Sequence, residues 1–241
     1  MTKLKLKNDR AGFVEEVIHP IALIDPHIAA FHQPGSHVSD QYRTAFAGLQ
    51  ALEHPPHSMV ITSVSSGEGR SVACLNLAVT IAKETSKRVL VIDCDFHHPT
   101  LHEYLSLPFE GGILDVIKGS CELDSSIKKT IVPNLFLLTS GAIPEHLFGI
   151  CSSPEFKSAV NTLKEKFDYI LFDSAPLDHY PDSALIGQHL DGAVMIVRSE
   201  VTQREALETA KEKLENLQVH IFGCILIRYK YHIPLLIHKF V

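Results

Sequence analysis

The feature that most constrains this chain is a glycine-rich turn between an apolar stretch and a helical pattern, Ile61-Thr-Ser-Val-Ser-Ser-Gly-Glu-Gly-Arg-Ser71. In such a turn, glycines let backbone N–H groups close on phosphate oxygens, and the final Ser hydroxyl reaches Mg²⁺. The sequence therefore predicts a phosphate-binding loop (P-loop). Arg70 stands where these loops carry the Lys that contacts the β- and γ-phosphates, so it is a candidate catalytic residue. The expected nucleotide-binding residues are Ser66, Gly67, Glu68, Gly69, Arg70, Ser71 and Val72.

Apolar strand patterns alternate with helical patterns along most of the chain. Continuous β-branched, apolar runs are typical of strands that are buried on both faces of a parallel sheet. The alternation predicts an α/β fold with a doubly wound, mostly parallel sheet. Strands are expected at 58–64, 88–93, 135–138, 169–173, 193–197 and 220–227, and helices at 39–52, 71–84, 153–166 and 202–217.

Prolines at positions 20, 26 and 34 interrupt the N-terminal region, which shows no sustained period. We expect residues 1–38 to form an extended lead-in with at most short helices. The next helix should begin with Ser39 or Asp40 as its cap, since short polar side chains are preferred there. The predicted division is thus a lead-in at 1–38, a P-loop domain at 39–228 and a tail at 229–241.

Composition narrows the classes of partner. The net charge of −6 argues against nucleic acid as a partner, since phosphate backbones are bound by basic surfaces. The 5 cysteines form no CxxC pair, for which a reducing cytoplasm is the simplest setting. No apolar run reaches the ~18 residues of a membrane-spanning helix, so we expect any membrane contact to come through a partner.

Carboxylates follow two of the expected strands. Asp93 and Asp95 leave the strand at 88–93, and Asp173 ends the strand at 169–173. Because ligands bind beyond the carboxyl ends of the strands in open α/β sheets, these side chains should converge on the P-loop. Carboxylates placed in this way hold Mg²⁺ in phosphoryl transfer. Asp173 fits that role, Ser71 would be the direct metal ligand, and of Asp93 and Asp95 one would serve the metal while the other faces the nucleophile.

Further motifs accompany the loop in a fixed order. They are Asn76-Leu77-Ala78, Val91-Ile92-Asp93-Cys94-Asp95-Phe96-His97-His98-Pro99, Asp168-Tyr169-Ile170-Leu171-Phe172-Asp173-Ser174-Ala175-Pro176 and Asp191-Gly192-Ala193. Over roughly residues 20–228, the chain resembles the bacterial tyrosine kinases, which are P-loop autokinases of the deviant Walker A type that regulate capsule and exopolysaccharide synthesis and export.

The resemblance implies specific roles and partners. ATP or ADP with Mg²⁺ would sit on the P-loop, Asp93 would activate a substrate tyrosine hydroxyl, and Asp95 and Asp173 would organise the metal. The substrate would be a C-terminal tyrosine of a neighbouring copy in a ring-shaped homo-oligomer. A separate membrane adaptor of the polysaccharide chain-length-regulator type would be the partner, with the chain in the cytoplasm or peripheral to the inner face of the membrane.

Departures from the family pattern fall on functional positions. Besides Arg70, they are His97 in place of Arg, Ile227 in place of an Asn near the base, and Phe46 in place of the second Arg of a ring-forming pattern that keeps Asp40 and Arg43. The only tyrosines near the C-terminus are Tyr229 and Tyr231. Arg keeps the charge of Lys but is a wider, planar fork. We therefore expect a nucleotide-binding member whose phosphotransfer is weak or lost.

Two alternatives stay open. One is an active autokinase that phosphorylates Tyr229 and Tyr231. The other is a positioning ATPase of the chromosome-partitioning type, although such proteins normally carry a second Lys where this chain has Ser65.

Overall fold

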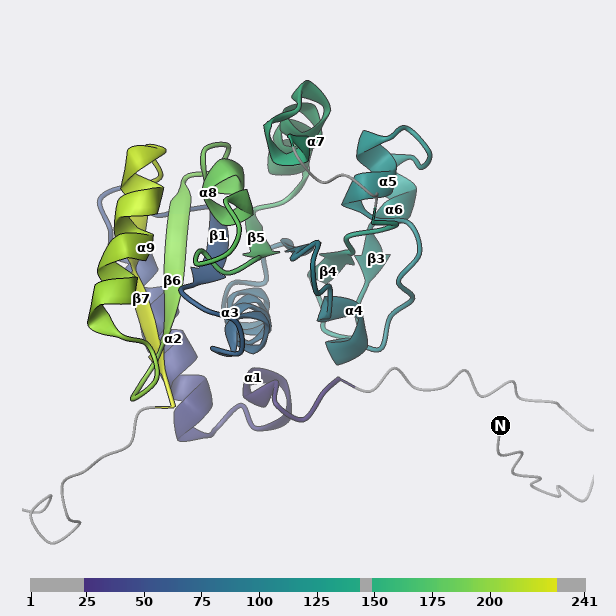
Figure 1. Cartoon of the computed structure of the whole chain (residues 1–241). Helices are drawn as coiled ribbons and strands as arrows, with labels where there is room; N and C mark the ends of the chain where they lie inside the picture. The colour runs from purple at the N-terminus through teal and green to yellow at the C-terminus, as the bar shows by residue number, and fades with distance from the viewer. Residues whose placement is uncertain (1–23, 144–148, 229–241) are drawn as a thin grey trace, which may run out of the picture.

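The structure, a computed structural model, describes residues 24–143 and 149–228, which are arranged around a seven-stranded sheet (Figure 1). Its strands lie in the order β3-β4-β2-β5-β1-β6-β7. All the described neighbours are parallel except β3, which is antiparallel to β4. The strands are β1 (Ser58–Ser63), β2 (Val89–Cys94), β3 (Lys128–Lys129), β4 (Leu135–Leu138), β5 (Tyr169–Ser174), β6 (Gly192–Arg198) and β7 (Ile221–Ile227). The expected α/β, mostly parallel fold is confirmed.

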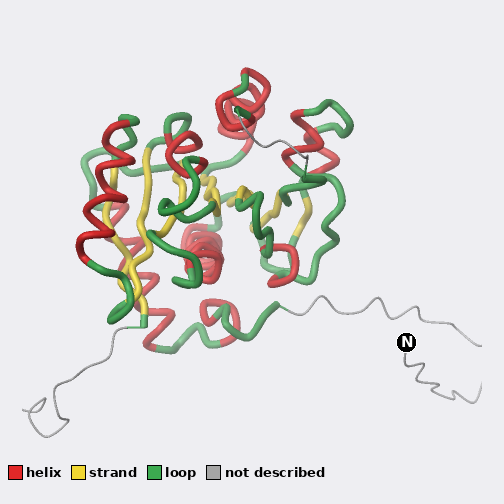
Figure 2. The backbone as a smooth tube through the Cα atoms, in the orientation of Figure 1, coloured by secondary structure: helices red, strands yellow, loops and turns green. Residues whose placement is uncertain are grey.

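Helices cover both faces of the sheet, so that strands lie between two helical layers (Figure 2). One layer contains α1 (Ala29–His32), α2 (His37–Gln50), α3 (Arg70–Thr85) and α4 (Leu101–Tyr104). The other contains α5 (Ile113–Ile117), α6 (Leu123–Ser126), the 3-10 helix η1 (Ile150–Ser152), α7 (Pro154–Lys166), α8 (Asp182–Gly187) and α9 (Arg204–Asn216). Short segments such as α4 and α8 were not anticipated, because one or two turns carry too few residues to show a period.

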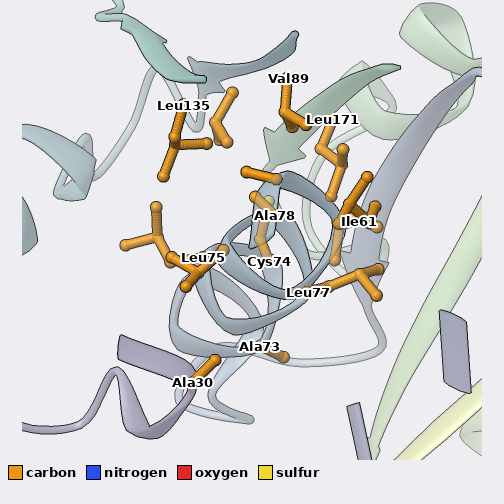
Figure 3. Packing of buried hydrophobic residues seen from close by; sticks show 14 of the residues in the cluster. Ala30, Ile61, Ala73, Cys74, Leu75, Leu77, Ala78, Val89, Leu135 and Leu171 are labelled. Carbon is orange, nitrogen blue, oxygen red and sulfur yellow. The ribbon is translucent and has the colours of Figure 1, made fainter. Parts of the chain in front are cut away.

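Helix α3 is the centre of one layer and lies almost wholly inside the protein. Its Ala73, Cys74, Leu75, Leu77 and Ala78 point among side chains of β1, β2, β4 and β5 on one side and of α1 on the other (Figure 3). Each fully buried Leu contributes about 1.5–3 kcal/mol relative to an exposed one. The helix that follows the P-loop is therefore held rigidly, and so is its first residue, Arg70.

The packed structure begins before residue 39, the boundary expected from the sequence. Ile24 and Ile28 are buried in the core. Asn76 of α3 ties this segment down: its Oδ1 accepts a hydrogen bond from Ala30 N at 2.9 Å, and its Nδ2 donates to His27 O at 3.1 Å. Pro26 thus lies in a packed turn, and Pro34 follows the short helix α1. Residues 1–23 and the tail at 229–241, with Tyr229 and Tyr231, lie outside the described residues.

Two local expectations were wrong. The cap of α2 is Ser36, whose Oγ accepts from Ser39 N at 3.2 Å, rather than Ser39 or Asp40. The strand at 220–227 was expected to be buried, but β7 is an edge strand on which Cys224 is exposed and Leu226 is 52% exposed. Apolar composition cannot distinguish an edge strand from a central one, because edge position depends on sheet order. No helix in the described ranges is long and apolar enough to cross a membrane.

Candidate functional site

The P-loop connects β1 to α3 at the carboxyl end of the sheet, beside the central strands. Gly67 and Gly69 adopt φ angles of +76° and +75°, in the left-handed region that favours glycine. A Cβ on Gly69 would lie 2.8 Å from Ile227 Cδ1 at the end of β7. Ile227 therefore packs directly against the loop, at the position where the family resemblance implies an Asn near the base. The turn is tight and leaves little space for a side chain at residue 69.

A brace from the β6–α9 connection holds the loop in this shape. The buried Glu68 carboxylate accepts Ser65 N at 3.0 Å through Oε2 and the Thr202 hydroxyl through Oε1. Arg198 Nη1 donates to Gly67 O at 3.2 Å, and its own N–H donates to Thr202 Oγ1 at 2.9 Å. Both oxygens of Glu68 are thus used to shape the loop, and its predicted contact with a nucleotide stays a prediction. No pattern in the sequence indicates this brace, which joins residues 134 positions apart.

The side chain of Arg70 turns inward, toward the acidic residues beyond the strands. Its Nε donates to Asp173 Oδ1 at 3.0 Å, and its Nη2 donates to Asp95 Oδ2. Nη1 lies 3.4 Å from Ser63 Oγ at the end of β1. Arg70 is only 8% exposed. The structure therefore brings Arg70, Asp95 and Asp173 into one buried cluster, which we call the Arg70 cluster.

The charges of the Arg70 cluster are strongly coupled. Burial acts to lower the pKa of Arg70, but the carboxylates of Asp173 and Asp95 outweigh it and raise that pKa. Burial raises the pKa of Asp173, while the Arg70 guanidinium and the Ser71 hydroxyl act in the opposite direction. One oxygen of this carboxylate, Asp173 Oδ2, is buried without a hydrogen-bond partner. The guanidinium is thus the cation that compensates these carboxylates in the structure.

Asp93, the predicted base, is fully buried and is bonded to backbone. Its Oδ2 accepts from Thr100 N and Leu101 N, both at 3.0 Å, at the start of α4. Its Oδ1 lies 3.3 Å from Asp95 N. Burial and the nearby charge of Asp173 raise the pKa of Asp93 well above its ordinary value, although the Leu101 N–H opposes them. Asp93 therefore holds the turn after β2 in place, and its role as a base stays a prediction.

The residues expected to hold Mg²⁺ have suitable atoms but not a suitable arrangement. Hydroxyl and carboxylate oxygens such as those of Ser71, Asp95 and Asp173 are the ligands that Mg²⁺ prefers. Two of these carboxylates are already bonded to Arg70. Within the described ranges, no group of three or more His, Cys, Asp or Glu side chains is arranged to hold a metal ion. As they are placed, these residues do not fit a resident Mg²⁺.

The other departures from the family pattern are accommodated by packing. The His97 ring stacks on Tyr180 at 3.5 Å between centroids, and its Nε2 lies 3.2 Å from Asp182 Oδ2. Phe46 is buried and contacts Tyr169 edge-on, with centroids 5.9 Å apart. Each substituted side chain thus belongs to a cluster inside this chain.

The surviving part of the ring-forming pattern lies on the surface. Arg43 pairs with Asp40 at 2.6 Å and with Glu84 of α3 at 2.7 Å. The charge of Arg43 is thus paired with carboxylates of the same chain, and a contact with a neighbouring copy stays a prediction.

The glycine turn between β1 and a buried helix, with aspartates gathered at the strand ends, defines a P-loop α/β domain. The family model for the AAA domain matches residues 58–221. Tyrosine-protein kinase YwqD of Bacillus subtilis is 30% identical over 202 residues, which are 83% of this chain and 85% of the relative. Tyrosine-protein kinase wzc of Salmonella typhi is 30% identical over 181 residues, but the chain spans only 25% of its length. The chain belongs to the bacterial tyrosine kinase family of P-loop domains.

Solved structures have the same fold. The chimerical protein CapA2B2 superposes with a TM-score of 0.80 at 27% identity, over 86% of this chain and 92% of the other. The kinase domain of Escherichia coli tyrosine kinase ETK gives a TM-score of 0.77 at 18% identity, over 86% and 83%. The MinC:MinD complex of Aquifex aeolicus gives 0.63 at 24% identity, over 76% and 72%. The last two likenesses show the fold alone.

Proposed function

We propose that this chain is an ATP- and ADP-binding protein of exopolysaccharide or capsule biosynthesis and export, in which phosphotransfer to tyrosine is weak or lost. The nucleotide phosphates would lie on residues 66–72. Binding would act as a signal for assembly rather than as the first step of catalysis. The observation that supports this proposal most strongly is that the Arg70 side chain points inward and is bonded to Asp95 and Asp173.

Phosphoryl transfer needs a cation aimed at the phosphoryl group. In P-loop enzymes, a Lys from the loop supplies it together with Mg²⁺. Here the corresponding cation is bonded to Asp95 and Asp173, below the loop. Removing one positioned electrostatic donor from a transition state costs about 10²–10³ in rate. The backbone N–H groups of a glycine-rich turn still favour phosphate binding. Binding with slow transfer is the combination that this geometry supports.

The pathway and the partner follow from the family rather than from the site. Family members of this form are expected to act with a membrane adaptor of the chain-length-regulator type, and in a homo-oligomer. The Asp40–Arg43–Glu84 network on α2 and α3 is the surface that we propose for contact between copies. Size-exclusion chromatography with light scattering, with and without ADP, measures the oligomeric state of the wild type and of Arg43→Ala.

An active autokinase is the second candidate, and the grouping of three aspartates beneath the P-loop favours it. In that case Asp93 would act as base, and Tyr229 and Tyr231 would be the acceptors. A positioning ATPase is a weaker candidate. The likenesses to a plasmid partition protein of Borrelia burgdorferi and to the MinC:MinD cell division complex are at or below 24% identity and a TM-score of 0.63, and the first relatives named above are tyrosine kinases.

Phosphotyrosine blotting after incubation with ATP and Mg²⁺ separates these functions. We expect a wild-type signal weaker than that of Arg70→Lys by about 10²-fold or more. Arg204→Lys, the same change on the exposed face of α9, is the matched control and should behave as the wild type. A strong wild-type signal that disappears in Asp93→Asn would contradict the proposal and support the autokinase. Tyr229→Phe/Tyr231→Phe would then test the acceptors.

A further inference from the structure

The Arg70 cluster contains a cation that is part of the chain. Two buried carboxylates, Asp95 and Asp173, each accept a hydrogen bond from the guanidinium of Arg70. All three side chains are less than 10% exposed. Buried charges of one sign are strongly unfavourable unless an opposite charge is bonded to them. Something positive is therefore required at this position, and the structure supplies it from residue 70.

The geometry suits a guanidinium better than a point charge. Its planar fork places Nε and Nη2 on two different carboxylates at once, whereas a Lys ammonium presents a single nitrogen. The third aspartate does not compete for it, because the oxygens of Asp93 face the backbone N–H groups of residues 95, 100 and 101. The fork thus bonds to one oxygen of Asp173 and one of Asp95, and the other oxygen of Asp95 accepts from His98 N at 3.1 Å.

We propose that the guanidinium of Arg70 replaces the divalent cation that P-loop phosphotransferases hold at this place, so that the Arg70 cluster is complete without a metal and binds free Mg²⁺ or Mn²⁺ only weakly. The inference concerns the protein without nucleotide and does not depend on whether the chain transfers phosphate.

Little remains for a metal to bind while Arg70 is in place. Asp173 Oδ2 is the carboxylate oxygen of the pair that the structure leaves buried and without a hydrogen-bond partner. Mg²⁺ completes its octahedral shell with water but is anchored by one or two carboxylates, and here both carboxylates are bonded to Arg70. A second cation would also lie within a few ångströms of the guanidinium, where like charges repel each other strongly at low effective dielectric constant. Removing the guanidinium should therefore create a metal site rather than destroy one.

Titration with Mn²⁺, followed by the electron paramagnetic resonance of the free ion, tests this directly on the full chain without nucleotide. The wild type should bind Mn²⁺ at least about tenfold more weakly than Arg70→Met. Arg70→Met/Asp95→Asn should lose the binding that Arg70→Met gains. Arg204→Met, which removes an exposed guanidinium that is paired with Glu208, is the matched control and should bind as the wild type does.

Thermal unfolding gives a second readout. Mg²⁺ should raise the melting temperature of Arg70→Met by several degrees, because a ligand that binds only the folded state stabilises it, and should leave the wild type unchanged. If Arg70→Met does not fold, Arg70→Lys replaces it in both experiments and should also bind Mn²⁺ more tightly than the wild type does. The proposal would be overturned if the wild type bound the metal as tightly as the Arg70 variants do, or if neither Arg70→Met nor Arg70→Lys gained metal binding.

Discussion

The two ends of the sheet hold aspartates in opposite ways, an exposed one at the amino end and buried ones at the carboxyl end. At the amino end, Asp191 accepts from His57 N at 2.9 Å and Ser58 N at 2.8 Å, across the start of β1. Burial acts to raise the pKa of Asp191, but these N–H groups and Lys164 outweigh it and lower that pKa. At the carboxyl end, the pKa values of Asp93 and Asp173 are raised. The amino end is therefore arranged to stabilise its carboxylate, whereas the carboxyl end keeps carboxylates in surroundings that disfavour their charge.

The difference separates a structural role from a functional one. A carboxylate that only holds strands together can be satisfied completely by the backbone. Carboxylates that are crowded under a phosphate-binding loop reduce stability, and groups in such surroundings are common at functional sites. In this protein, a single buried guanidinium limits that cost.

Among substitutions at the two ends of the sheet, we expect Arg70→Met to lower the free energy of unfolding most. Leaving Asp95 and Asp173 buried without their cation should lower the free energy of unfolding by about 3–5 kcal/mol. Urea denaturation in the presence of EDTA measures this. Arg70→Met/Asp95→Asn should lose less than the single variant, because one of the repelling charges is gone. Equal losses in the two variants would show that the guanidinium contributes packing rather than charge compensation.

Asp93 should give the carboxyl end its pH dependence. Because the folded-state pKa is raised, its stabilising contribution is complete below the unfolded pKa near 4 and is lost as the pH rises toward the folded value. Within that window, the free energy of unfolding should fall by about 1.4 kcal/mol per pH unit on account of this group. Asp93→Asn should flatten the decline above about pH 4. An unchanged slope would show that Asp93 is ionised in the folded protein.

Asp191 should show the opposite dependence on pH. Its folded pKa is lowered, so its contribution is present above the unfolded value of 3.8 and is lost as the pH falls through the folded pKa. Asp191→Ala should therefore lower the free energy of unfolding by about 1 kcal/mol at neutral pH and by less in acid. The effect is this small because the side chain is partly exposed to solvent. Denaturation at two pH values measures the difference. A cost that grows in acid would contradict the contrast between the two ends.

The smallest effect is expected at Arg43, which also pairs with two carboxylates but lies on the surface. Solvent screens such pairs, and ordering the side chains offsets much of the attraction. The urea midpoint of Arg43→Ala should stay close to that of the wild type, in clear contrast to Arg70→Met. A loss as large as that of Arg70→Met would show that burial is not what separates the two arginines.

The fold could be predicted because its signals are local. The apolar run at 88–93 coincides almost entirely with β2 (Val89–Cys94), and Ser153 caps α7 at the expected start. The gathering of Asp93, Asp95 and Asp173 at one end of the sheet also follows from strand direction alone.

The direction of Arg70 could not be predicted in this way. Its partners lie 25 and 103 positions away along the chain, and the sequence does not say whether the guanidinium faces a ligand or the protein interior. The brace between Glu68 and Thr202 and the exposure of β7 likewise depend on how distant elements pack. Local patterns thus indicate where the site lies, and tertiary contacts determine which groups its side chains bond to.

Isothermal titration of the full chain with ADP, once in EDTA and once in excess Mg²⁺, tests most directly whether Arg70 takes the place of the metal in a nucleotide-binding protein. We expect ADP to bind in both conditions, with dissociation constants that agree within about threefold. The binding of ADP by Arg70→Lys should depend on Mg²⁺. Wild-type binding that is seen only with Mg²⁺ would contradict the central claim.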